Sequence, residues 1–173
     1  MNRIEKTLLI ESIKDFNLPE YNEIPNVGLY LEQTAKYINE YLKPIQDSPI
    51  TGSMISNYVK KGLVSNPIKK QYSREQIAYL FFISVAKSVI SMDDIKLLLN
   101  LQKEIYSPDI AFNYFQEELE NVLRFVFEIK DTIDEIGTHH SEEKMILRNI
   151  IVAVAHKVYI DKCFKILHNI EEI

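Results

Sequence analysis

The chain has 173 residues, with 20 basic and 25 acidic side chains and a formal net charge of −5. Hydrophobic residues make up 46% of it, and it contains only four glycines and one cysteine. These values are typical of a globular domain and exclude a disordered, collagen-like or low-complexity chain. The single cysteine also excludes an intramolecular disulfide framework and a zinc site built from several cysteines.

No segment of the sequence has the features of a signal peptide or of a membrane span. The first residues lack an apolar core followed by a small-residue cleavage site. The two longest apolar stretches, 77–90 and 145–160, contain charged side chains and fall short of the roughly 20 apolar residues that a spanning helix needs. We therefore expect a soluble, cytoplasmic protein that does not associate with membranes.

Two helices are predicted in the first 42 residues. Apolar residues from Ile4 to Phe16 recur every three or four positions, which predicts a short helix that stops before Pro19. The same spacing recurs over residues 31–42 and predicts a second helix. Residues 43–50 are then expected to form a polar connection.

Five residues are suited to cap the N-termini of the later helices, because serine and threonine side chains accept a hydrogen bond from a free N–H of the first turn. These residues are Thr51, Ser73, Ser91, Ser107 and Ser141. Ser73 stands three residues before Gln76, the spacing of a capping box, and Ser107 is followed by a proline at the first helical position. The sequence therefore predicts an almost entirely helical protein.

One stretch, residues 63–72, is predicted to contain strands. It follows a short helix over 52–61 that we expect to end at Gly62 in a left-handed conformation. Its centre holds Asn66-Pro67, which is a turn signal. The sequence predicts a small β-hairpin in which Val64-Ser65 and Gln71-Tyr72 flank a tip that carries Lys69 and Lys70.

The C-terminal part is predicted to be a helical hairpin. Apolar residues over 112–136 alternate in steps of three and four, the pattern of a seam between packed helices. The seam residues are Phe112, Phe115, Leu119, Val122, Val126, Ile129, Ile133 and Ile136. Gly137 is expected to end this helix, and a last helix is predicted from about residue 142 to 168, although 150–154 also has the composition of a buried strand. The seam either closes the hairpin within one chain or pairs two protomers.

The charge is unevenly distributed along the chain. Residues 51–75 contain five basic side chains and one acidic one, a net charge of +4, so the remaining residues carry −9. From residue 104 onward, 7 basic side chains stand against 14 acidic ones. A compact basic segment beside an acidic region is typical of a nucleic-acid-binding face joined to a differently charged module.

The basic segment is organised like a winged helix-turn-helix, with the helix 52–61 as recognition helix and 31–42 as its support. Helical spacing places Ser53, Ser56, Asn57, Lys60 and Lys61 on its outer side. Serine and asparagine bind base edges or phosphates, and lysine neutralises phosphates. We therefore expect a mainly α-helical protein with three regions: an N-terminal helix and loop (1–24), a winged helix-turn-helix domain (25–104) and an acidic helical hairpin (105–173) for dimerisation or effector binding.

The same region contains several spaced elements in a fixed order: Ile55 to Leu63, Pro67, Lys70 to Ser73, Leu80 and Ile83, and then Ile90 to Ile95 with Leu98 and Leu99. Together these elements resemble the DNA-binding domain of MerR-type transcriptional regulators. It is closer to an uncharacterised bacterial family of MerR-like proteins, whose pattern includes Leu29-Tyr30, Thr51, Met54-Ile55, Asn57 to Lys60, and Lys70 with Tyr72-Ser73.

This resemblance implies a homodimer that reads the major groove of duplex DNA. By position, Ser56, Asn57 and Tyr58 fall where a MerR-type recognition helix meets DNA, and Lys69 and Lys70 fall on the wing. The full set of predicted DNA-binding residues is Thr51, Ser53, Ser56, Asn57, Tyr58, Lys60, Lys61, Lys69, Lys70, Tyr72 and Arg74. The chain lacks the arginine that MerR-type proteins typically carry at the position of Ser56 or Asn57.

The same residues allow other interpretations than DNA binding. Tyr58 and Tyr72 could be core aromatics, and the lysine pairs could be ordinary surface charge. The MerR-like domain could also have lost DNA binding and serve as a protein-interaction module. The sequence has no residue arrangement typical of catalysis, and His139-His140 is best explained as a polar turn, so we expect no enzyme activity, no metal and no cofactor. A small-molecule or protein effector on the C-terminal helices remains an option.

Overall fold

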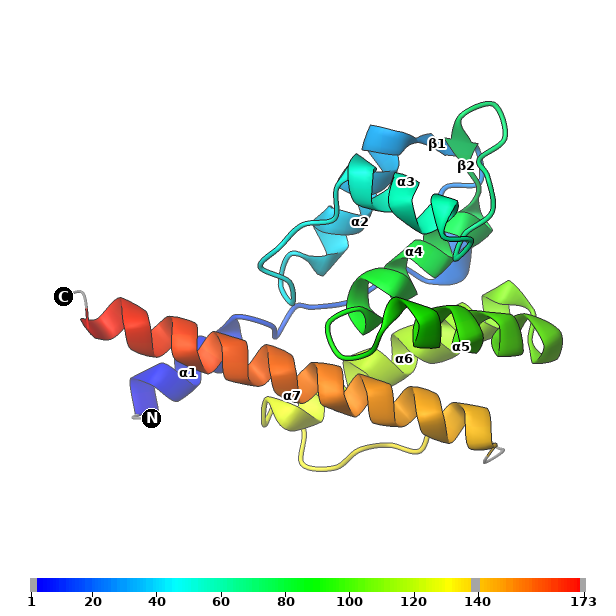
Figure 1. The fold of residues 1–173 in the computed structure, drawn as a ribbon. Coiled ribbons are helices and arrows are strands. Elements are labelled where there is room, and N and C mark those ends of the chain that lie inside the picture. The colour runs from blue at the N-terminus through cyan, green and yellow to red at the C-terminus, as the bar shows by residue number, and fades with distance from the viewer. Residues whose placement is uncertain (1–2, 138–140, 172–173) are drawn as a thin grey trace.

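The structure is a computed structural model that describes residues 3–137 and 141–171 (Figure 1). It is mainly helical, as predicted. The described residues form seven α-helices: α1 (Arg3–Glu11), α2 (Leu31–Leu42), α3 (Gly52–Lys60), α4 (Arg74–Ala86), α5 (Met92–Ile105), α6 (Pro108–Val126) and α7 (Glu142–Glu171). A 3-10 helix, η1 (Tyr21–Glu23), and two short strands, β1 (Leu29–Tyr30) and β2 (Gln71–Tyr72), complete the fold.

The helices pack around one continuous hydrophobic core that includes residues from Leu9 to Val158. In Figure 1, α2, α3 and the two strands lie together at one end, and the long helix α7 runs along the other side with α1 next to it. Helix α4 joins the two parts, and nearly all of its side chains are buried. A helix that is apolar on all sides is expected at such a central position.

The predicted helix caps are largely confirmed. The Thr51 hydroxyl oxygen accepts a hydrogen bond from the backbone N–H of Met54 at 3.2 Å. Ser73 forms a capping box with Gln76, with hydrogen bonds of 3.3 and 2.8 Å. The hydroxyls of Ser91 and Ser141 also accept hydrogen bonds from first-turn amides, whereas Ser107 precedes its helix without one.

The predicted pairing of the hairpin strands is wrong. Strand β2 pairs in antiparallel register with β1, which lies before α2, so that Leu29 faces Tyr72 and Tyr30 faces Gln71. Val64 does not pair with β2, and its side chain and that of Leu63 are buried in the core. The tip of the predicted hairpin is present, however, as a tight turn between bridged Ile68 and Gln71.

The prediction of one continuous helix from 112 to 136 is also wrong. Helix α6 ends at Val126, and Glu128 adopts a left-handed conformation with φ of 57°. The chain then runs back beside α6, where the Asn121 side chain donates to the Asp134 carbonyl oxygen at 2.9 Å and accepts from the Asp134 N–H at 3.1 Å. This reversal removes Ile129, Ile133 and Ile136 from the predicted helical seam.

The part of the seam that is helical closes within the chain. Phe112, Phe115, Leu119 and Val122 are buried in the single chain, where α6 packs against α4 and α7. At most 4% of each of these residues is exposed, so they pack inside the chain and offer little surface to a second copy. The last helix extends over the stretch 150–154, which excludes the strand interpretation.

One ion pair is buried in this α6–α7 interface. The Glu118 side chain has no exposed surface, and its Oε1 lies 2.9 Å from Nε of Arg148 on α7. Burial raises the pKa of the Glu118 carboxyl, and the positive charge of Arg148 opposes this shift only in part. Ionisation of this carboxyl therefore costs more free energy in the folded chain than in the unfolded chain.

A helix that crosses a membrane has to be both long and apolar. Within residues 3–137 and 141–171, no helix combines the length and apolarity required to cross a bilayer.

Candidate nucleic-acid interface

Helix α3 is held against α2 by one face. Ile55 and Tyr58 on this face are buried, with 0% and 3% of their surface exposed. The N-terminal turn lies so close to α2 that a Cβ at Gly52 would come within 3.2 Å of the Leu31 side chain. A larger residue at this position would require the Leu31 and Glu32 side chains to shift, so glycine suits the close approach of α3 to α2.

The opposite face of α3 is polar and exposed. It presents Ser53, Ser56, Asn57 and Lys60, and Lys61 follows directly at the C-terminal end. This is the set predicted from helical spacing. The face combines short polar side chains that can reach base edges with lysines that can reach phosphates.

The C-terminus of α3 is fixed by a Schellman-type turn. Gly62 adopts a φ of +72°, and the N–H groups of Gly62 and Leu63 donate to the carbonyls of Val59 and Tyr58 at 2.9 and 3.0 Å. From α5, Nζ of Lys96 donates to the Lys61 carbonyl oxygen at 3.0 Å. Lys96 thus adds a cation beside the predicted set, and only the tertiary packing of α5 brings it there.

The turn between Ile68 and Gln71 carries two lysines in an unusual backbone conformation. Lys69 and Lys70 have φ of 50° and 64°, and the Gln71 N–H donates to the Ile68 carbonyl oxygen at 2.9 Å. Two consecutive positive φ values with this hydrogen bond are the pattern of a type I′ turn, for which Asn-Gly is the favoured pair. Lysine at both positions costs conformational energy. A functional role of the two charges would explain why lysine is present there nevertheless.

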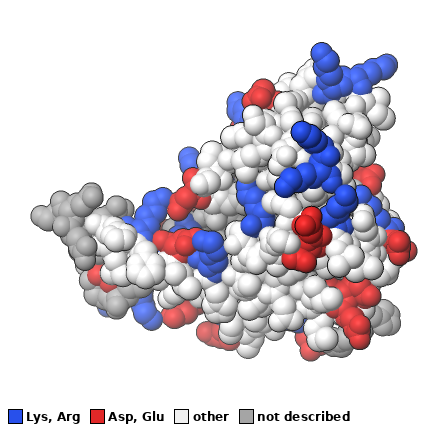
Figure 2. Space-filling view, viewed as in Figure 1, with Lys and Arg blue, Asp and Glu red and all other residues white. Residues whose placement is uncertain are grey.

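Positive charge gathers on the face formed by α3 and this turn. Figure 2 shows Lys and Arg side chains at the tip of the turn and over the adjoining end of α3, whereas acidic side chains are more frequent over the lower half of the view. Lys60, Lys61, Lys69 and Lys70 are all exposed, and none of them forms an ion pair with a described residue. Their charges are therefore available to an anionic partner.

Three predicted DNA-binding residues have structural roles instead. Tyr58 and Tyr72 are buried, with 3% and 4% of their surface exposed, and burial raises the pKa of both phenols. Nε and Nη2 of Arg74 donate to the carbonyl oxygens of Ile24 and Asn22 at 2.8 and 3.1 Å. The structure thus supports the interpretation of both tyrosines as core aromatics, and Arg74 holds η1 and the residue that follows it against α4.

Thr51 has a mixed position. It is exposed, but its hydroxyl oxygen caps α3. A helix N-terminus with its cap can also approach a phosphate through its backbone N–H groups. The candidate interface therefore consists of the exposed α3 residues, Lys69 and Lys70 of the turn, and Lys96, with Thr51 at its border.

Comparison with known proteins gives one match. The model of the family described as a domain of unknown function, DUF1836, matches residues 19–122. No curated protein and no solved structure matches the chain. The matched range contains α2, α3, the lysine-bearing turn, α4 and α5, and it covers more than half of the sequence. The protein is therefore a member of the DUF1836 family.

Proposed function

We propose that the protein is a transcriptional regulator that binds duplex DNA through α3 and the turn at 68–71. The observation that carries this proposal is the group of four exposed lysines that flank the polar face of α3 and have no ion-pair partner among the described residues. A protein of net charge −5 with such a concentrated basic face is suited to a polyanion at that face alone.

The parts of this face have different roles in the proposal. Ser56 and Asn57 lie in the middle of the exposed side of α3, where side chains of a recognition helix reach base edges in the major groove. The lysines at the end of α3 and on the turn neutralise phosphates on either side. The turn acts as a wing, and the resemblance to MerR-type regulators supports the same assignment.

We further propose that the protein acts as a homodimer, which pairs through an apolar surface on α1 and α7. This α1–α7 surface consists of the exposed side chains of Ile4, Leu8, Ile160, Phe164 and Leu167. The three α7 residues follow the spacing of a helical stripe, and α1 packs beside α7. Pairing two copies there would bury this apolar surface and present two DNA-binding faces to a two-fold symmetric site.

The proposal is tested by retardation of a pool of genomic DNA fragments on a native gel at low salt. We expect wild-type protein to retard fragments and Lys60→Gln/Lys61→Gln to lose most of this binding. The matched control is Lys14→Gln/Lys165→Gln, which removes the same charge outside α3, the turn and α1, from two lysines that form only exposed ion pairs.

Failure of wild-type protein to retard any fragment would contradict DNA binding. It would favour the alternative, a protein-interaction module with a MerR-like fold. Equal losses in the two double variants would show that only the net charge matters, and would contradict the assignment of the face.

A further inference from the structure

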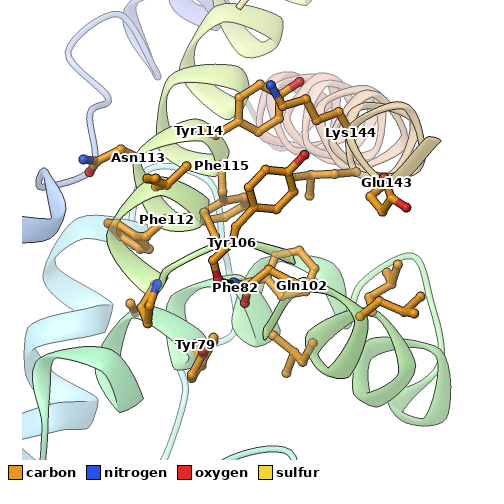
Figure 3. A pocket seen from close by; sticks show the side chains of 18 of the residues that line it. Tyr79, Phe82, Gln102, Tyr106, Phe112, Asn113, Tyr114, Phe115, Glu143 and Lys144 are labelled. Carbon is orange, nitrogen blue, oxygen red and sulfur yellow. Dashed lines mark hydrogen bonds between the residues drawn. The ribbon is translucent and has the colours of Figure 1, made fainter. Parts of the chain in front are cut away.

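A pocket of about 430 Å³ lies at the junction of α4, α5, α6 and the first turns of α7. Figure 3 shows side chains from these elements converging around it, with Tyr106 in the middle and Lys144 and Tyr114 together on one side. The segment at Ile136 and Gly137, which runs back beside α6, closes another part of the wall. The volume falls within the range of small-molecule sites in proteins.

The lining is apolar and rich in aromatic rings. Phe82 of α4 and Phe115 of α6 meet edge to face with ring centroids 5.4 Å apart, and Leu98 and Leu101 of α5 form the facing wall. When water fills an apolar cavity of this size, the hydrophobic side chains of its wall stay hydrated. Contact with an apolar ligand would bury this surface and is more favourable. The pocket therefore favours an occupant with a large apolar surface.

Three of the polar groups in the lining are already engaged within the chain. The Gln102 side chain donates to the Tyr106 carbonyl oxygen at 2.9 Å, and Oδ1 of Asn113 accepts from the Tyr21 N–H at 2.8 Å. The ammonium group of Lys144 lies over the Tyr114 ring, 4.9 Å from its centroid. These groups therefore offer an occupant little hydrogen bonding or charge pairing.

The acidic groups at the rim point to the charge of the occupant. The Glu143 carboxylate is held by Ser141 and the backbone at the start of α7, and these hydrogen bonds lower its pKa. Glu117 is exposed at the edge of the pocket. An anionic occupant would meet two carboxylates. A cationic one would meet the Lys144 ammonium and lose its hydration in an apolar cavity, whereas a neutral occupant has neither cost.

We propose that this pocket is a binding site for a neutral, mainly apolar and aromatic small molecule. The site is separate from the DNA-binding face and does not depend on it. Its walls come both from α4 and α5, which continue the proposed DNA-binding region, and from α6 and α7. An occupant that binds there bridges the two parts of the chain and stabilises the arrangement shown in Figure 1.

The test uses the full chain and the neutral fluorophore N-phenyl-1-naphthylamine. We expect saturable binding, seen as a rise in fluorescence, and a higher melting temperature with the probe present. Leu98→Trp on α5 and Ala111→Phe on α6 each fill part of the pocket and should weaken binding at least tenfold. The matched control is Leu97→Trp, since its side chain is 59% exposed and does not line the pocket.

Three results would overturn the proposal. The first is unsaturable probe binding, or binding that neither pocket variant weakens although circular dichroism shows both to be folded. The second is tighter binding of the anionic analogue 8-anilinonaphthalene-1-sulfonate than of the neutral probe, since it would contradict the neutral class. The third is a wild-type dimer in sedimentation velocity that Leu98→Trp dissociates, because the pocket would then be an interface between copies.

Discussion

Replacement of Lys69 by Asn and Lys70 by Gly should weaken DNA binding while it makes the folded chain more stable. Both lysines have φ values in the left-handed region, at 50° and 64°. This conformation costs a non-glycine residue about 1 kcal/mol or more, and Asn-Gly is the pair that a type I′ turn prefers. We expect the double variant to gain about 1–2 kcal/mol of unfolding free energy, which raises Tm by roughly 2–8 °C for a chain of this size.

The effect on DNA binding follows from counterion release. Each phosphate contact contributes about 0.9 to the slope of log affinity against log salt, so loss of two contacts lowers the slope by about 1.8 per protomer. Between roughly 50 and 200 mM salt, the fall in affinity should then be about 12-fold smaller than for wild type. Fluorescence anisotropy of a labelled duplex at several salt concentrations measures both slopes, with Lys14→Gln/Lys165→Gln as the charge-matched control.

The two readouts separate a DNA-binding role from a general loss of fold. A variant that melts at a higher temperature yet binds with a flatter salt dependence confirms the assignment of the turn as a wing. A slope equal to that of wild type, within the error of the control, would refute it. A lower Tm would refute the argument that the turn is strained.

Three further variants test the packing and the assembly. Glu118→Gln should flatten the dependence of the unfolding free energy on pH, which urea unfolding at several pH values measures. Burial raises the folded-state pKa of the Glu118 carboxyl above its ordinary value of 4.5. The protonated carboxyl therefore contributes its full stability below pH 4.5, and this stability is lost as the pH rises through the folded-state pKa. Gly62→Ala should lower the unfolding free energy by about 1–2 kcal/mol, because φ is +72° there, and an unchanged urea midpoint would contradict this. Phe164→Asp should weaken the proposed dimer at least tenfold in sedimentation equilibrium without a loss of Tm, whereas Leu97→Asp, an equally exposed site on α5, should leave the dimer intact.

Local signals predicted the helices well. Thr51, Ser73, Ser91 and Ser141 cap helices as expected, because an N-cap hydrogen bond depends only on residues within one turn. The left-handed Gly62 and the exposed face of α3 were also predictable, since helical periodicity alone decides which side chains share a face.

The predictions of local structure were wrong where a residue far away in the sequence determines that structure. The end of α6 at Val126 is marked by neither glycine nor proline, and it depends on Asn121 holding Asp134 across the reversal. The partner of β2 is β1, which precedes α2 and lies about 40 residues earlier in the sequence.

Within the candidate interface, burial was the property that the sequence did not determine. Tyr58 and Tyr72 are of a residue type that often contacts DNA, but their rings lie in the core. Arg74 belongs to the basic segment by position, yet two backbone carbonyls hold its guanidinium. Lys96 was not predicted, because its place beside Lys61 arises from the packing of α5.

Selection of bound fragments from a genomic DNA library, carried out in parallel with wild-type protein and Asn57→Ala, tests the central claim most directly. Asn57 is exposed at the middle of the polar face of α3, so its loss should change the enriched sequence at one base pair of each half-site. The account predicts one enriched motif for wild type and a relaxed preference at that position for the variant. Enrichment of no motif by wild type, or of an identical motif by both proteins, would contradict the assignment of α3 as the helix that reads DNA.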